Sequence, residues 1–188
     1  IAVNLVELTD DDPSSKVGQM KIYTQKNGRT STGLTPVVTS AHTTRDIDLE
    51  VMFHRKVLQN DLLIDEVLSS EEQNEFLQLP RNAKTAVKFM QGNHMYGKIA
   101  LSQPLNYECH DMVSDGIAPN IGYIAQAFEV NDLGISEKAI ADLNCEIYNQ
   151  RRLIDFPGLG QIEIIMVKAP GSGALQLIFK ARNSQGID

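Results

Sequence analysis

Residues 46–54 read DIDLEVMFH, and apolar and polar residues alternate along almost all of this stretch. Successive side chains of a β-strand project to opposite faces, so the alternation predicts a half-buried strand. The apolar face of this strand would point into a core and carry Ile47, Leu49, Val51 and Phe53. The polar face would carry Asp46, Asp48, Glu50 and His54.

The residues before this stretch are predicted to form strands joined by polar turns. We expect strands at residues 2–8 and 17–24, separated by an acidic turn that ends at Pro13. The dipeptide Asn27-Gly28 then predicts a tight turn.

Helical spacing predominates after residue 60. Residues 61–68 carry a broad apolar stripe that predicts a short helix, and Ser70 with Gln73 forms a capping box that predicts a second one. Further along, we expect helices at residues 82–91, 117–128 and 136–154, and a strand at residues 96–101.

The chain ends in two apolar segments, residues 161–168 and 174–182, joined by a Pro- and Gly-rich turn at 169–173. This pattern predicts a C-terminal β-hairpin. Together the segments predict a single α+β domain over residues 1–188, with a mainly antiparallel sheet and helices packed on one face. We detect no internal repeat.

Composition narrows the classes of partner. The chain has 188 residues and a formal net charge of −7, from 24 acidic and 17 basic residues. The basic residues are scattered, so we expect no sequence-independent binding to nucleic acid and none to anionic membranes. No run of about 18 apolar residues is present, so we expect no spanning helix. The two separate cysteines and the lack of a glycosylation sequon favour an intracellular location.

The polar face of the 46–54 strand is the first candidate site. Same-face neighbours in a strand lie about 6.6–6.8 Å apart. The carboxylates of Asp46, Asp48 and Glu50, with His54, could therefore share a hard cation such as Ca²⁺ or Mg²⁺ if other segments completed the ligand shell. We prefer the simpler interpretation of a solvated strand face.

Cys109 and His110 are the second candidate. Adjacent residues of an extended segment face opposite ways, so they could not easily act together as nucleophile and base. A catalytic Cys109 would need His42, His54 or His94 from elsewhere in the fold. An inert cysteine is the preferred interpretation, and a disulfide with Cys145 is a further alternative.

No phosphate-binding loop, dinucleotide fingerprint, zincin motif or nucleophile elbow is present. The sequence therefore favours a non-enzymatic structural or interaction protein with no cofactor. The preferred form is a self-assembling subunit, for example of a viral or phage particle, or a protein-binding module. It would pair with itself or with a protein partner through the predicted strand at residues 2–8, and deleting residues 1–12 should change the assembly.

Two alternatives stay open. One is a small metal- or cysteine-dependent hydrolase that uses the Asp46–His54 face or Cys109. The other is a ligand-binding protein with a pocket between the sheet and the predicted helix at residues 136–154.

Overall fold

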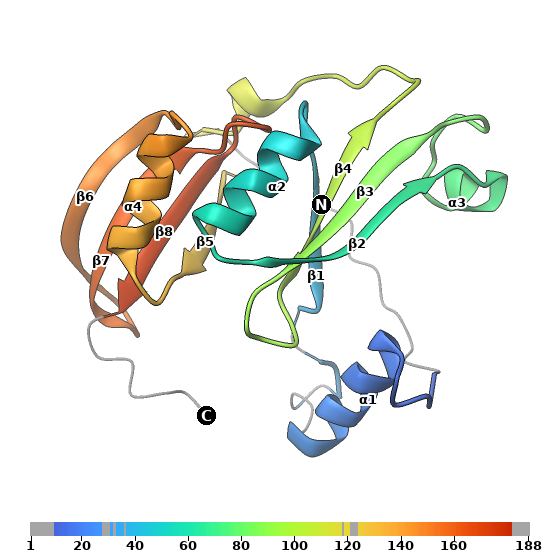
Figure 1. Ribbon diagram of the computed structural model, residues 1–188, viewed down its shortest axis with the longest axis horizontal. Coiled ribbons are helices and arrows are strands. Elements are labelled where there is room, and N and C mark those ends of the chain that lie inside the picture. The colour runs from blue at the N-terminus through green and yellow to red at the C-terminus, as the bar shows by residue number, and fades with distance from the viewer. Residues whose placement is uncertain are drawn as a thin grey trace.

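The computed structural model describes residues 10–27, 31, 33–35, 37–117, 119–120 and 124–181. The predicted strand at residues 2–8 and Gly28 of the predicted turn lie outside these residues. The described residues form two four-stranded sheets that stand side by side, with helices between and beside them (Figure 1).

Each sheet is mixed. The first has the order β1-β4-β3-β2, in which β1 and β4 run parallel and the other pairs antiparallel. Its strands are β1 (Thr39–Thr43), β2 (Asp61–Leu68), β3 (Thr85–Gln91) and β4 (Lys98–Pro104). The second has the order β5-β8-β7-β6, in which β5 and β8 run parallel. Its strands are β5 (Ala125–Glu129), β6 (Ile147–Phe156), β7 (Gly160–Lys168) and β8 (Leu175–Ala181).

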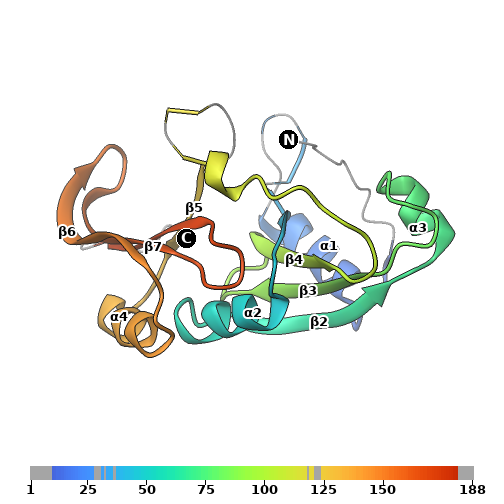
Figure 2. The ribbon, with the colours of Figure 1, turned by 90° about the horizontal axis from the view of Figure 1, so that it is seen from above.

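Four α-helices accompany these sheets in the described part of the chain: α1 (Lys16–Asn27), α2 (Ile47–Lys56), α3 (Glu71–Phe76) and α4 (Leu133–Asp142). A single 3₁₀ turn, η1, spans Val113–Asp115. Helix α2 contacts β2, β3 and β4, and α4 contacts β8 and α2. The two helices lie next to each other along one side of the molecule (Figure 2).

Each sheet belongs to one of two units that share the same topology. Each unit runs strand, long helix, then three strands, and both sheets have the same order and the same pairing directions. Both long helices begin in the same way, because the side chains of Asp46 and Asp132 accept hydrogen bonds from the second and third amides that follow them. The two units share their topology and the caps of their long helices, and the sequence shows no matching repeat of residues.

Helix α2 joins the two units through its apolar side chains. Ile47 and Val51 pack with the buried residues of the first sheet, whereas Phe53, Val57 and Leu58 pack with those of the second sheet and α4. Burial of these side chains removes apolar surface from water on both sides of one helix. Helix α2 and the two residues after it are thereby held in the junction between the sheets.

The prediction of a strand at residues 46–54 is wrong, because this stretch forms α2. Buried positions within the helix are Ile47, Glu50, Val51, Phe53 and His54, and most of them recur at the spacing of one helix face. Asp46, read as a strand residue, is instead the helix cap. The change of period brings Glu50 and His54 inside.

Other segments also differ from their predictions. Residues 17–24 lie in α1 instead of a strand. Residues 61–68 and 82–91 contain the paired strands β2 and β3 instead of helices. The described part of residues 117–128 contains most of β5 instead of a helix. The predicted helix at residues 136–154 is divided between the end of α4 and most of β6. In the segments that form β2, β3, β5 and β6, long-range strand pairing outweighs local apolar spacing.

Three local predictions are confirmed. Ser70 and Gln73 form the predicted capping box at the start of α3. Strand β4 covers much of the strand predicted at residues 96–101. Strands β7 and β8 pair antiparallel and form the predicted C-terminal hairpin.

The α+β class is confirmed, but two mixed sheets replace the single, mainly antiparallel one. Within the described residues, no helix has both the length and the apolar character needed to cross a membrane.

Candidate metal centre

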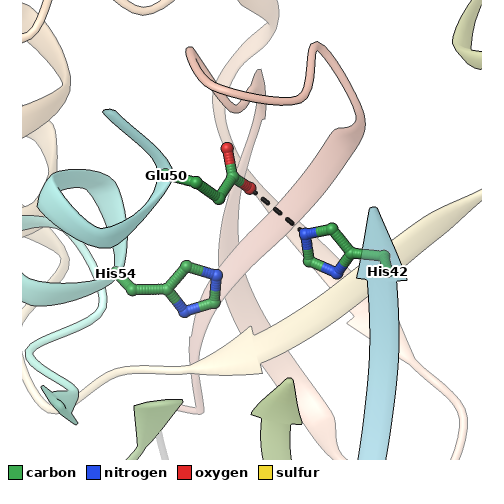
Figure 3. A group of neighbouring side chains, drawn as sticks. All are labelled: His42, Glu50 and His54. Carbon is green, nitrogen blue, oxygen red and sulfur yellow. Dashed lines mark hydrogen bonds and ion pairs between the residues drawn. The ribbon is translucent and has the colours of Figure 1, made fainter. Parts of the chain in front are cut away.

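Three side chains converge where β1 meets the first half of α2. Glu50 and His54 are four residues apart and project from the same face of α2, while His42 projects toward them from β1 (Figure 3). Each residue offers one ligand atom, and these atoms all lie within 4.8 Å of one another.

Glu50 is fully buried and is held by the turn between β7 and β8. Its Oε2 accepts a hydrogen bond from the Ser172 amide at 2.9 Å, and its Oε1 accepts one from Ser172 Oγ at 3.1 Å. Its Oε1 also lies 3.4 Å from Nε2 of His42. These donors fix the carboxylate, and Oε1 is the oxygen that lies beside His42.

Gly171 allows the β7–β8 turn to approach α2 this closely. A Cβ atom at this position would lie 2.2 Å from the carbonyl oxygen of Asp46 and 2.7 Å from the amide nitrogen of Glu50. The carbonyl of Gly171 accepts hydrogen bonds from the amides of Arg45 and Asp46. The second unit therefore supplies the turn that positions a carboxylate of the first.

His54 is also fully buried. Burial lowers its pKa from 6.5 to about 4, the nearby Glu50 partly opposes this shift, and His42 adds to it. The imidazole is therefore neutral at physiological pH. Its Nδ1 lies 3.3 Å from Nδ2 of Asn60, and its Nε2 has no hydrogen-bond partner among the described residues.

The chemistry of this donor set suits a first-row metal. Two imidazole nitrogens and one carboxylate oxygen are the ligands of many catalytic zinc and non-haem iron sites. In a tetrahedral zinc site with bonds of about 2.0–2.1 Å, ligand atoms stand about 3.4 Å apart. His42 and Glu50 already have this spacing, and binding would draw His54 nearer to them.

The second unit shows that the fold does not require these polar residues. Counted from the helix caps, His42, Glu50 and His54 lie at −4, +4 and +8 from Asp46. The residues at the same offsets from Asp132 are Phe128, Ser136 and Ile140. Ser136 Oγ donates to the backbone carbonyl of Val57, and Ile140 is in the apolar core. Only the first unit carries ligand-type side chains at all three positions.

A cavity of about 630 Å³ adjoins the cluster. His42 is the member of the cluster that reaches its wall, close to Ser172 of the β7–β8 turn. Gln126 of β5 and Gln176 of β8 line the same cavity. Pockets of this size commonly take small organic molecules.

The structure divides the predicted acidic face. Glu50 and His54 enter the cluster, but Asp46 caps α2 and the exposed Asp48 forms an ion pair with Lys88 at 3.1 Å. Asp46 and Asp48 point away because a helix places successive residues about 100° apart around its axis, unlike a strand. The predicted hard-cation ridge is therefore replaced by a smaller cluster with two histidines.

Cys109 and His110 lie in the loop after β4, where both are exposed and line the cavity. Both Cys109 and Cys145 are free thiols, so the alternative of a disulfide between them is wrong. Burial, with a contribution from the charge of Glu50, raises the pKa of Cys145 to about 11. Neither cysteine is hydrogen-bonded to a histidine side chain in the part of the chain that is described.

Sequence reasoning named His42 only as a possible partner for Cys109. The signal for the cluster was the spacing Glu50-x-x-x-His54, which places both side chains on one face of a helix. This signal could not be used while the segment was interpreted as a strand. The third member, His42, is brought in by tertiary structure, because it lies on β1, eight positions before Glu50 and on a different element.

No protein-family model matches the sequence, and no curated protein matches it. Solved structures do share the fold. A glyoxalase family protein from Bacillus cereus is 13% identical and aligns over 81% of this chain and 98% of its own, with a TM-score of 0.67. The protein SMU.1112c is 13% identical over 78% of this chain and 98% of its own, with a TM-score of 0.53. A point variant of glyoxalase I from Zea mays is 11% identical over 77% of this chain and 47% of its own, with a TM-score of 0.52.

At these identities the likeness shows the fold alone. It is nevertheless sufficient to correct the functional prediction. The prediction of a non-enzymatic, self-assembling structural subunit of a viral or phage type is wrong, because the paired units are a fold of glyoxalase-family proteins.

Proposed function

We propose that this protein binds a divalent first-row metal ion through His42, Glu50 and His54, and a small organic molecule in the adjoining cavity. This proposal replaces the expectation of no cofactor. It also goes beyond the fold likeness, because it depends on side chains of this chain alone.

The observation that carries the proposal is the state of His54 Nε2. This nitrogen is buried, belongs to a neutral imidazole, lies beside a buried carboxylate and a second imidazole, and has no partner among the described residues. A buried polar group without a partner costs about 1–3 kcal/mol. A bound metal ion would satisfy Nε2 and compensate the charge of Glu50 together.

Asn60 has a supporting role in this proposal. Metal on Nε2 requires the ring proton on Nδ1, and the partner of Nδ1 fixes the orientation of a metal-binding imidazole. The carboxamide of Asn60 is within hydrogen-bond reach of Nδ1 and could accept that proton through its oxygen. A bound metal would act as a Lewis acid toward an oxygen atom of the small molecule.

Metal binding can be tested by isothermal titration of chelator-treated protein with Zn²⁺ and Co²⁺. We expect one site per chain, and for Co²⁺ the visible absorption of a low-symmetry site with nitrogen and oxygen ligands. His42→Ala and Glu50→Gln should each weaken binding by more than the roughly 10–100-fold that loss of an outer-shell partner costs.

His94→Ala is the matched control. His94 is exposed in the turn between β3 and β4, where its ring lies against Tyr23 and Tyr96. Its removal should leave the stoichiometry and affinity unchanged. Loss of binding in His94→Ala, with binding kept in Glu50→Gln, would place the metal on the surface and contradict the proposal.

The cavity that takes the small molecule lies at the junction of the two sheets, where β1, β5, β8 and the loop after β4 contribute its wall. The earlier alternative of a pocket between a sheet and the helix at residues 136–154 placed the site differently. Self-association or binding to a protein partner stays a prediction from the sequence pattern, and the lack of binding to nucleic acid stays a prediction from net charge.

A further inference from the structure

The cavity wall contains two buried carboxamides that the proposed metal site does not use. Gln126 and Gln176 have exposed fractions of 7% and 1%, and both line the cavity. The Oε1 atom of each is buried and has no hydrogen-bond partner among the described residues. Buried polar groups are normally hydrogen-bonded, so each of these carbonyl oxygens is an acceptor without its hydrogen-bond donor.

The two carboxamides are neighbours. Gln126 and Gln176 are register partners on the parallel strands β5 and β8, and paired strands lie about 4.7–4.9 Å apart, so the side chains leave the sheet together. The amide of Gln126 is also oriented, because its Nε2 donates to Ser40 Oγ at 3.3 Å. The structure thus presents two adjacent acceptors.

We infer that Gln126 and Gln176 bind the polar end of a neutral small molecule that carries two hydroxyl or N–H donors. This inference rests on the small-molecule cavity of the proposed function, but not on its metal. Hydroxyl or N–H groups would donate hydrogen bonds to the Oε1 atoms of both carboxamides. The rest of the molecule would lie against the apolar part of the cavity wall, which is lined by Pro104, Met112, Val113 and Ile124.

The charges in the wall favour a neutral ligand over an anion. Arg45 and Asp111 both line the cavity, and their side chains form an ion pair with a separation of 2.5 Å. The Nε–H donor of Arg45 is thereby engaged, and the carboxylate of Asp111 balances its positive charge. Two further carbonyl acceptors would repel a carboxylate or phosphate placed beside them.

The test uses three probes with one apolar body: 3-phenylpropane-1,2-diol, its dimethyl ether, and 3-phenylpropanoate. Their affinities for the full chain are measured by ligand-observed NMR after chelator treatment. The diol is expected to bind about 10-fold or more tightly than the ether, since each hydrogen bond makes a modest net contribution. The carboxylate should bind more weakly than the diol.

The variant Gln126→Met/Gln176→Met keeps the side-chain volume and removes both acceptors. The ratio of diol affinity to ether affinity should fall to about 1. Thermal stability should change little, because removal of two unpartnered buried acceptors offsets loss of the hydrogen bond from Gln126 to Ser40. Thr43→Val is the matched control. Thr43 also lines the cavity, but its hydroxyl is already paired with Ser102 Oγ at 3.1 Å, so the ratio should not change.

Equal binding of diol and ether to the wild type, failure of both to bind at millimolar concentration, or preference for the carboxylate would each overturn the inference. If the double variant does not fold, the carboxamides are structural and the inference is again overturned. All probe measurements are made without metal, so their outcome does not depend on whether His42, Glu50 and His54 bind a metal ion.

Discussion

Replacement of Glu50 by Gln removes one of the proposed metal ligands and one buried charge with little change of shape. In the metal-free protein, the new carboxamide can still accept from the Ser172 amide, but it loses charge-assisted hydrogen bonds that now measure 2.9 and 3.1 Å. Hydrogen bonds to charged groups contribute about 1.5–3 kcal/mol each. We therefore expect the metal-free variant to unfold several degrees below the wild type.

The metal-dependent part of the effect is separate. Zn²⁺ at 100 times the wild-type Kd would stabilise the native state by about 2.7 kcal/mol. For a chain of this length, each kcal/mol moves Tm by about 2–4 °C, so wild-type Tm should rise by about 5–10 °C. The same Zn²⁺ concentration should move the Tm of Glu50→Gln by no more than about 1–2 °C, because most of the site remains unfilled.

The assay is thermal unfolding followed by circular dichroism, with chelator and then with a Zn²⁺ series, for the wild type, Glu50→Gln and His94→Ala. His94→Ala should behave as the wild type does. A Zn²⁺-induced rise in Glu50→Gln equal to that of the wild type would refute the assignment of Glu50 as a ligand, whatever the stability of the metal-free variant.

Three further predictions follow from the same geometry. His54 has a folded-state pKa of about 4 and an ordinary value of 6.5, so the unfolded chain binds the proton first. Stability in chelator should be fully present above about pH 6.5 and fall by up to about 3 kcal/mol toward pH 4. Urea unfolding at a series of pH values should show that the free energy of unfolding of His54→Leu depends less on pH between 4 and 6.5 than that of the wild type. An unchanged pH dependence would contradict the buried, neutral imidazole. Gly171→Ala should destabilise the protein by about 1–3 kcal/mol and weaken metal binding, because the new Cβ meets the backbone of α2. Gly134→Ala, near the start of α4, should be neutral or slightly stabilising, and equal losses in the two variants would exclude the close approach as the cause. Asn60→Asp should raise metal affinity in titrations by placing a carboxylate on Nδ1 of the imidazole, and a lower affinity would assign Asn60 no part in orienting the ring.

Local signals predicted those parts of the fold that depend on a few neighbouring residues. The capping box of Ser70 and Gln73 is complete within four residues, so it could be identified without tertiary information. The C-terminal hairpin combined two apolar runs with a turn rich in Gly and Pro, and both strands are paired as expected.

Residues 46–54 show why other parts were not predictable. Their alternation also contains the helical set Ile47, Val51 and His54, and the two periods coincide at several positions. Asp46 was the informative residue, since a capping Asp before an apolar residue marks a helix start. Strand β2 gave the opposite error, because its clustered apolar residues resemble a helix stripe although the strand pairs with β3.

The candidate site was half accessible from the sequence. Glu50 and His54 were identified as candidate ligands, but on a strand face with Asp46 and Asp48. The other residues of the site lie on separate elements of the two sheets: His42 on β1, Gln126 on β5, Gln176 on β8 and Ser172 in the β7–β8 turn. They meet only because the two sheets pack against each other. No spacing rule links residues that far apart along the chain.

The most direct test is a crystal structure of the protein soaked with Zn²⁺, with anomalous difference maps calculated on both sides of the zinc absorption edge. We expect one strong peak bonded to Nε2 of His42, a carboxylate oxygen of Glu50 and Nε2 of His54. Peaks confined to exposed groups such as Asp48, His94 or His110, with hydrogen bonds unchanged around Glu50, would contradict the metal centre.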